Sequence, residues 1–140
     1  MQVSYVTPED FDYVWDKIKA MIRKGLRHGQ GDSLTEDSLK KSIHRGDNLL
    51  LVAHDDDEVY AGIIVEITQY PNKKTVFVVL VAGKEINNWG SEVEAALKML
   101  KYNANADTIE ASCRSGMAKY LMNRSWKQKA LIMELPDESN

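Results

Sequence analysis

The chain has 140 residues, of which 44% are hydrophobic and 28% charged, and its formal net charge is −3. This length supports one sizeable hydrophobic core and is too short for two ordinary domains, so we expect one domain over residues 1–136 and a tail at 137–140. No apolar run approaches the roughly 20 residues that span a bilayer, and the N-terminus lacks a signal-peptide pattern, so we expect no membrane insertion and no secretion by that route. The single cysteine, Cys113, excludes an internal disulfide.

The first part of the chain predicts a short strand followed by a helix. The strand covers residues 2–6. Thr7 is the expected N-cap of the helix and Pro8 its first residue, a position where the missing N–H of proline has no cost. Apolar side chains then recur at three- and four-residue spacing over residues 11–22, which indicates a helix lying on a core until it ends at Gly25.

A loose glycine-containing loop at residues 29–31 separates this helix from a second, shorter one. The pattern from Ser33 to Glu36 resembles a capping box and predicts where the second helix begins. Gly46 predicts where it stops, because glycine readily adopts the left-handed conformation that ends helices.

The middle of the chain predicts a meander of three strands, and the last third predicts alternating helices and strands. Branched apolar residues mark the meander strands, and the acidic turn at 55–57 is too polar to be buried. These strands cover residues 49–54, 59–69 and 75–82. They are followed by a helix from about 89 to 100, a strand at 108–113, a helix at 116–124 and a closing strand at 126–135.

The resulting order, β-α-α-β-β-β-α-β-α-β, resembles that of a GCN5-related N-acetyltransferase (GNAT) domain over essentially the whole chain. Short motifs bring the sequence close to small bacteriophage-encoded GNAT-like proteins; these motifs are Val6-Thr7-Pro8-Glu9-Asp10 with Val14-Trp15, Tyr70-Pro71, Gly83 with Trp89, and Arg114-Ser115-Gly116. Met117 stands where that family commonly has a tryptophan. The resemblance implies an α/β (α+β) fold with a mixed central sheet flanked by helices, a phage structural protein or a host protein as partner, and a location in the host cytoplasm or the virion.

The resemblance also implies an acetyl-CoA site at the loop between the fourth strand and the third helix. The family's loop has the form Arg/Gln-x-x-Gly-x-Gly/Ala, in which closely spaced glycines let backbone N–H groups turn toward a diphosphate. Here Gly83 and Gly90 stand seven residues apart, Glu85 adds a negative charge and Trp89 is bulky, so we expect a degraded site. If acetyl-CoA does bind, the resemblance assigns the contacts to Val81, Ala82, Gly83, Lys84, Asn87 and Asn88.

Two residues are candidates for catalysis. In GNAT enzymes a tyrosine of the fourth helix often protonates the leaving thiolate, and spacing from Trp126 places Leu121 at that position. Tyr120 is adjacent but about 100° further round the helix, so its hydroxyl is expected to point away unless the register shifts. Glu66, a carboxylate within an apolar strand, is a general base if it faces a pocket and a solvated residue if it lies on an open face.

Two functions remain open at this stage. The first is a non-catalytic virion, morphogenesis or host-interaction protein with a degraded coenzyme site. The alternative is an acetyl-CoA-dependent N-acetyltransferase acting on a small-molecule or protein amine, which a β-bulge near residues 79–81 and a splay between the fourth and fifth strands would favour. Complete pairing of those strands, with Trp89 filling the cleft, would exclude the alternative.

The distribution of charge and the spacing of the histidines bear on nucleic-acid binding and on metal binding. Residues 1–70 carry 8 basic and 13 acidic side chains, whereas residues 71–140 carry 10 basic and 8 acidic ones. The overall acidic balance argues against nucleic acid as a partner. His28, His44 and His54 share no metal-ligand spacing, so no metal site is expected.

Overall fold

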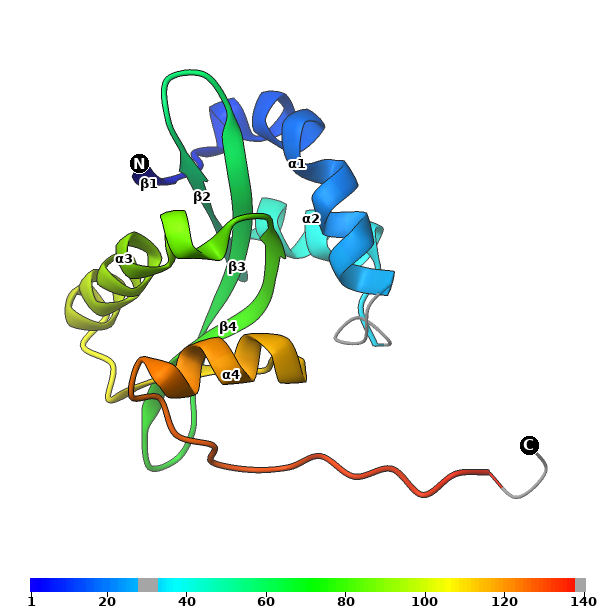
Figure 1. The fold of residues 1–140 in the computed structure, drawn as a ribbon, viewed down its shortest axis with the longest axis vertical. Coiled ribbons are helices and arrows are strands. Elements are labelled where there is room, and N and C mark those ends of the chain that lie inside the picture. Colours follow the sequence, from blue (N-terminus) through cyan, green and yellow to red (C-terminus); the bar gives the residue numbers. More distant parts are fainter. Residues whose placement is uncertain (28–32, 138–140) are drawn as a thin grey trace.

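The computed structural model describes residues 1–27 and 33–137, so the predicted loop at 29–31 lies outside the described residues (Figure 1). The strands are β1 (Gln2–Tyr5), β2 (Asn48–His54), β3 (Val59–Gln69), β4 (Lys74–Gly83) and β5 (Thr108–Ala111). The α-helices are α1 (Phe11–Gly25), α2 (Glu36–Arg45), α3 (Gly90–Asn103) and α4 (Ser115–Asn123). Short 3₁₀ turns at Pro8–Asp10 and Ile86–Asn88 precede α1 and α3.

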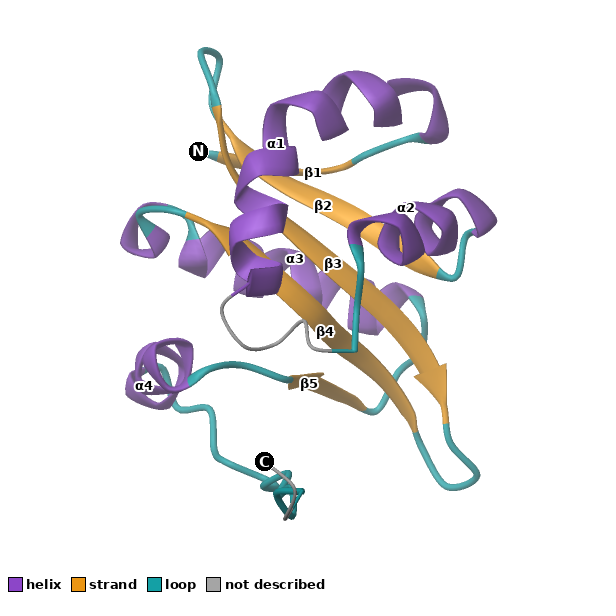
Figure 2. Ribbon diagram, turned by 90° about the vertical axis from the view of Figure 1, so that its right-hand side faces the viewer, coloured by secondary structure: helices purple, strands orange, loops and turns teal. Residues whose placement is uncertain are grey.

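The described strands form one five-stranded sheet in the order β1-β2-β3-β4-β5. Neighbours are antiparallel from β1 to β4, whereas β4 and β5 are parallel and are joined through α3. The prediction of a mixed central sheet flanked by helices is therefore confirmed. Because β5 is the last strand in the order, it forms one edge of the sheet (Figure 2).

Helices cover both faces of the sheet. In Figure 2, α1 and α2 lie in front of the strands and α3 lies behind them. Ile18 of α1, Leu39 of α2 and Ile64 of β3 belong to the buried cluster on the first face. Val93 and Leu97 of α3 belong to the cluster on the second. Burial on both faces explains why β3 and β4 read as nearly continuous apolar runs rather than as alternating ones.

The capping residue of α2 differs from the prediction. Thr35, not Ser33, is the N-cap: its hydroxyl accepts the N–H of Ser38 at 3.0 Å, and the Ser38 hydroxyl accepts the N–H of Thr35 at 3.0 Å. A serine at the third helical position can thus replace the glutamate of the usual capping box. The predicted end of α2 is confirmed, since Gly46 has φ 82°.

Replacing Thr35 with alanine should lower the free energy of unfolding by about 1 kcal/mol, because the N–H of Ser38 loses its acceptor. Urea unfolding followed by far-UV circular dichroism measures the change. Ser33→Ala is the matched control and should alter the stability by no more than a few tenths of a kcal/mol. Equal losses in the two variants would contradict the assignment of the cap.

The predicted closing strand is wrong for the described structure. Only Trp126 of residues 126–135 is half-buried, packed against the α3-side core, and residues 127–135 are exposed and outside the sheet. The pattern indicates strand propensity, but a strand also needs an edge to pair with. The C-terminal part of the chain runs away from the sheet (Figure 1). β5 is also shorter than predicted, ending at Ala111 rather than at Cys113.

Candidate functional site

One extra residue in β4 disturbs the regular pairing of the sheet. In the β3–β4 ladder Ile64 pairs with Leu80 and the next residue, Val65, pairs with Val78, so Val79 is an inserted, bulged residue. Leu80 and the partly buried Val79 consequently both pack toward α1, on the same face. A bulge of this kind bends its strand and increases the local twist.

β4 and β5 separate at the same place. Their pairing runs only from Thr75–Thr108 to Val78–Ala111, and residues 79–83 of β4 have no partner in β5. The prediction of a bulge near 79–81 is confirmed, and complete pairing of the two strands is contradicted. The splay leaves one face of the end of β4 open toward α3 and α4.

A cavity of about 60 Å³ lies in this splay. Its wall combines the two strands with the facing sides of α3 and α4, and includes Val81, Cys113, Met117, Tyr120, Leu121 and Trp126. Trp89 also lines the cavity and is 2% exposed, so it forms a wall and does not fill the space.

Tyr120 lies in this cavity, contrary to the expectation that its side chain points away. Met117, Tyr120, Leu121 and Arg124 all line it, because residues at i, i+3, i+4 and i+7 share one stripe of a helix. An offset of about 100° from Leu121 is thus compatible with the same cavity. The Tyr120 hydroxyl stands over the first residue of α3, where a Cβ on Gly90 would overlap it.

A carboxylate of α3 organises the polar rim of the cavity. Glu94 accepts a hydrogen bond from the Trp126 indole at 2.8 Å and pairs with Arg124 at 3.3 Å. The indole hydrogen bond is the largest influence holding the pKa of Glu94 below its ordinary value of 4.5, and the Arg124 guanidinium lowers that pKa further. Arg124 also lies 5.8 Å from the centre of the Tyr120 ring. These contacts fix α4 and Trp126 against α3.

The lowered pKa of Glu94 predicts an acid-sensitive part of the protein's stability. A carboxylate whose pKa is depressed by folding stabilises the fold above its unfolded pKa, and this contribution is lost as the pH falls through its folded pKa. Glu94→Gln should therefore lose less stability than the parent between about pH 6 and pH 3. Urea unfolding across this range measures the slope. Trp126→Phe should flatten the slope in the same direction, and parallel slopes in all three proteins would contradict the assignment.

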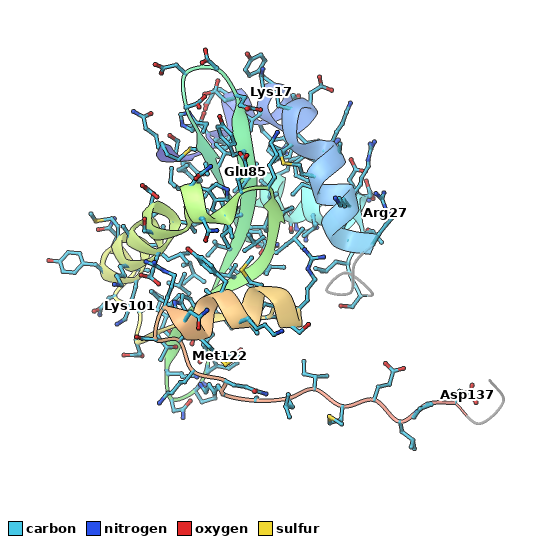
Figure 3. The ribbon with its side chains drawn as sticks, in the orientation of Figure 1. Lys17, Arg27, Glu85, Lys101, Met122 and Asp137 are labelled. Atoms are coloured by element: carbon cyan, nitrogen blue, oxygen red, sulfur yellow. The ribbon has the colours of Figure 1, made fainter. Side chains whose placement is uncertain are left out.

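The loop between β4 and α3 uses its two glycines for close packing. A Cβ on Gly83 would lie 2.5 Å from the carbonyl oxygen of Tyr60 and from the Cβ of Ala61, and Gly90 faces the Tyr120 hydroxyl. Glu85, labelled in Figure 3, has φ 60° and is exposed at the turn. These contacts account for both glycines without a phosphate.

The structure gathers few of the residues to which coenzyme contacts were assigned. Val81 lines the cavity, whereas Ala82 is 4% exposed and packs on the opposite face with α1. Lys84 is exposed, with its amine 3.5 Å from Glu58. Its carbonyl oxygen accepts the Trp89 indole N–H at 2.6 Å. Asn87 and Asn88 are exposed in the 3₁₀ turn.

Glu66 is exposed, so the expected burial is absent. It pairs with Phe77 in the β3–β4 ladder and does not line the cavity. The alternation of β3 places it on the same face as Ile64, toward α1 and α2, whereas the cavity opens toward α3 and α4. The structure therefore brings only one of the two catalytic candidates, Tyr120, into the site.

Sequence reasoning missed Glu94 and assigned no site role to Cys113. Glu94 was detectable, because α3 places Gly90, Val93, Glu94 and Leu97 on one stripe and a carboxylate is unusual there. Cys113 is a half-buried free thiol at the cavity wall, and its burial raises the pKa of the thiol. That wall exists only because β5 ends early, which no local pattern reveals.

The described residues contain neither a metal-ligand cluster nor a membrane-spanning helix. No group of three or more His, Cys, Asp or Glu side chains within residues 1–27 and 33–137 is placed to hold a metal ion. His28 lies outside the described residues. No helix in the described part of the chain is both long and apolar enough to cross a membrane.

Comparison with known proteins identifies the fold. No protein-family model and no curated protein matches the sequence. Among solved structures, a putative acetyl transferase from Pyrococcus furiosus superposes with a TM-score of 0.73 at 15% identity, covering 97% of this chain and 99% of that one. An aminoglycoside acetyltransferase from an uncultured soil metagenomic sample gives 0.72 at 13%, covering 98% of each chain. The aminoglycoside 6′-N-acetyltransferase of Acinetobacter haemolyticus gives 0.65 at 13%, covering 99% of each. The chain therefore has the fold of GNAT-type acetyltransferases.

Proposed function

We propose that the protein is an acetyl-CoA-dependent N-acetyltransferase that places the acyl-pantetheine arm of the coenzyme between β4 and β5. The observation that carries the proposal is the splay after Val78 and Ala111, which coincides with the bulge at Val79. Over residues 79–83 the side of β4 that faces away from β3 has no strand partner in β5, so its backbone groups offer hydrogen bonds to a ligand, and apolar side chains form much of the cavity wall. A thin amide-containing chain matches both features.

Tyr120 supplies the acid. Acetyl-CoA brings an acyl thioester, and transfer joins the acyl carbon to the nitrogen of an amine while the carbon–sulfur bond breaks. The departing thiolate takes a proton from the Tyr120 hydroxyl, and the amine nitrogen loses one to solvent. Within the described residues this hydroxyl has no hydrogen-bond partner, so it is available for the transfer.

A cationic small molecule is the acceptor that we propose. The first 70 residues carry an excess of acidic side chains, 13 against 8 basic ones, which attracts a positively charged amine. Two of the structural neighbours act on aminoglycosides according to their names, so aminoglycosides are the first acceptors to test.

Titration with acetyl-CoA in a calorimeter tests the proposal. We expect saturable binding with one site per chain. Val81→Trp should abolish it, because the indole would occupy the cavity. The matched control Met99→Trp changes a residue of α3 that is 61% exposed and should leave binding intact. Absence of binding to the parent protein, or equal binding by Val81→Trp, would overturn the proposal.

A second candidate is the non-catalytic, phage-type binding protein that the sequence resemblance implies. The observation in its favour is that Gly83 and Gly90 are both accounted for by close packing. On this proposal the surfaces serve a phage structural protein or a host protein, and the titration would show no binding of acetyl-CoA. The two candidates therefore predict opposite outcomes of one experiment.

A further inference from the structure

The C-terminal segment, defined here as residues 127–137, exposes an unusual amount of apolar surface. Leu131, Ile132, Met133 and Leu135 are 74%, 94%, 84% and 92% exposed. They follow one another in an extended chain that no described residue covers, and Asp137 lies far from the body of the protein (Figure 3). Contiguous exposed apolar side chains mark interaction sites in soluble proteins. This segment therefore needs a partner surface.

The sheet offers a matching surface at β5. One side of β5 pairs with β4, and its other side has no strand partner among the described residues. Ile109 and Ala111 of β5 are half-buried and pack against the α3-side core, so a strand added at this edge would cover them. An open edge with free N–H and C=O groups is a template for strand addition.

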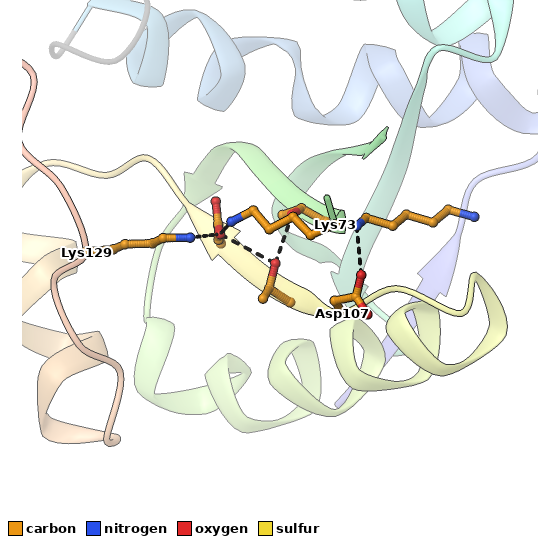
Figure 4. Close-up of polar contacts among 7 residues, drawn as sticks. Lys73, Asp107 and Lys129 are labelled. Carbon is orange, nitrogen blue, oxygen red and sulfur yellow. Dashed lines mark hydrogen bonds and ion pairs between the residues drawn. The ribbon is translucent and has the colours of Figure 1, made fainter. Parts of the chain in front are cut away.

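An ion-pair network already holds the start of the C-terminal segment beside β5. Glu110 accepts the amines of Lys129 at 2.5 Å and Lys73 at 2.6 Å (Figure 4). Glu110 is 22% exposed, so this pair is partly shielded from solvent. The C-terminal part of the segment runs outward from the body of the protein (Figure 1). The segment is thus tied at the sheet edge at one end while its apolar part projects away.

We propose that residues 130–135 of one copy add as a strand to the outer edge of β5 of a second copy, and that the exchange is mutual. The geometry supports a second copy because the same chain contains both complementary parts, the open edge and the unpaired segment. A reciprocal exchange is self-complementary under two-fold symmetry and closes without leaving an open end. The inference goes beyond the proposed function and does not depend on it.

Dimensions are compatible with this exchange. The six residues beyond the Lys129 ion pair, 130–135, span roughly 20 Å when extended. β5 has four residues and spans roughly 13 Å. Residues 130–135 are therefore long enough to pair with the whole of β5 in a second copy. Their unbroken apolar run at 130–133 suits a strand covered on both faces.

Sedimentation equilibrium of the full chain is the first test. We expect a mass of twice 15.9 kDa. Ile132→Asp should weaken the dimer by about tenfold or more, because it places a charge in the new interface. The matched control Tyr102→Asp alters an equally accessible apolar residue of α3, 83% exposed, and should leave the mass unchanged. Circular dichroism verifies that both variants are folded.

Pairs of single-cysteine chains distinguish exchange from other dimers. In a Cys113→Ser background, one chain carries a cysteine at each position of 108–111 in turn and the other carries Ile132→Cys. After mixing and oxidation, a disulfide between the two chains at one or more positions is expected, since bonding requires Cα atoms within about 7 Å. Tyr102→Cys replaces Ile132→Cys as the control and should give none.

Three other outcomes overturn the proposal. A monomer in which hydrogen exchange shows residues 130–135 protected would mean that the segment folds onto its own β5. A monomer in which these residues exchange freely would indicate that the segment binds a different protein. A dimer that persists in Ile132→Asp and gives no disulfide would place the contact elsewhere. Loss of acetyl-CoA binding with an intact dimer would affect the proposed function alone.

Discussion

Replacing Tyr120 with phenylalanine should lower kcat for acetyl transfer by about 10²–10⁴-fold, the usual contribution of a positioned general acid. The ring should keep its place, because phenylalanine preserves the aromatic part of the cavity wall that Tyr120 forms beside Met117 and Leu121. Only the hydroxyl over the start of α3 is removed. The rate is followed by release of the free thiol of CoA in the presence of an aminoglycoside acceptor.

Two further measurements separate this role from a structural one. The affinity for acetyl-CoA and the free energy of unfolding should change little in Tyr120→Phe, since the hydroxyl has no hydrogen-bond partner among the described residues. Tyr102→Phe, an 83% exposed tyrosine of α3, is the matched control and should keep full activity. An unchanged kcat in Tyr120→Phe would remove Tyr120 from catalysis.

Replacing Gly83 with alanine should destabilise the protein by about 3 kcal/mol or more, at the upper end of the range for overpacking. The added Cβ would lie 2.5 Å from the Tyr60 carbonyl oxygen and 2.7 Å from the Cα of Ala61, and backbone atoms cannot rotate away. β3 and β4 would have to separate at the end of β4, next to the cavity. Urea unfolding followed by tryptophan fluorescence measures the loss.

Gly116→Ala provides the comparison. Nothing lies within 4 Å of a Cβ built at Gly116, near the start of α4. Alanine there should leave the stability unchanged or raise it by about 0.5–1 kcal/mol, because it favours the helix. A Gly83→Ala protein as stable as Gly116→Ala would show that the β3–β4 contact is looser than the structure describes.

Most of the fold follows from local patterns in the sequence. Periodic apolar residues locate α1 and α3, and the long apolar runs locate β3 and β4, each within a few residues. The cap of α2 was misplaced by two residues, because Ser33 and Thr35 are chemically equivalent capping candidates and only the backbone conformation selects Thr35. The closing strand failed for a different reason. Strand propensity depends on the local sequence, whereas strand pairing depends on a sheet edge formed by a distant part of the chain.

The candidate site depends on non-local geometry and was predicted less well. A register shift at Val79 is invisible in an apolar run, although the resemblance indicated where to look. The direction of the Tyr120 side chain was predicted only from its angular offset from Leu121 around the helix. In the structure one stripe of α4 lines the cavity, and this stripe includes both Tyr120 and Leu121. Glu66 looked unusual in its strand and proved solvent-exposed. Patterns identify which residues are unusual, and tertiary packing decides which of them meet.

The inserted valine of β4 has a consequence for how such a sheet gains or loses its opening. Removing Val79 alone would leave Val78, Leu80, Val81 and Ala82 in strict alternation, each still on its present face. The core would keep every other member, while the kink that parts β4 from β5 would vanish. An in-frame loss of one codon would thus close the opening between β4 and β5 while the core-forming side chains of β4 keep their alternation.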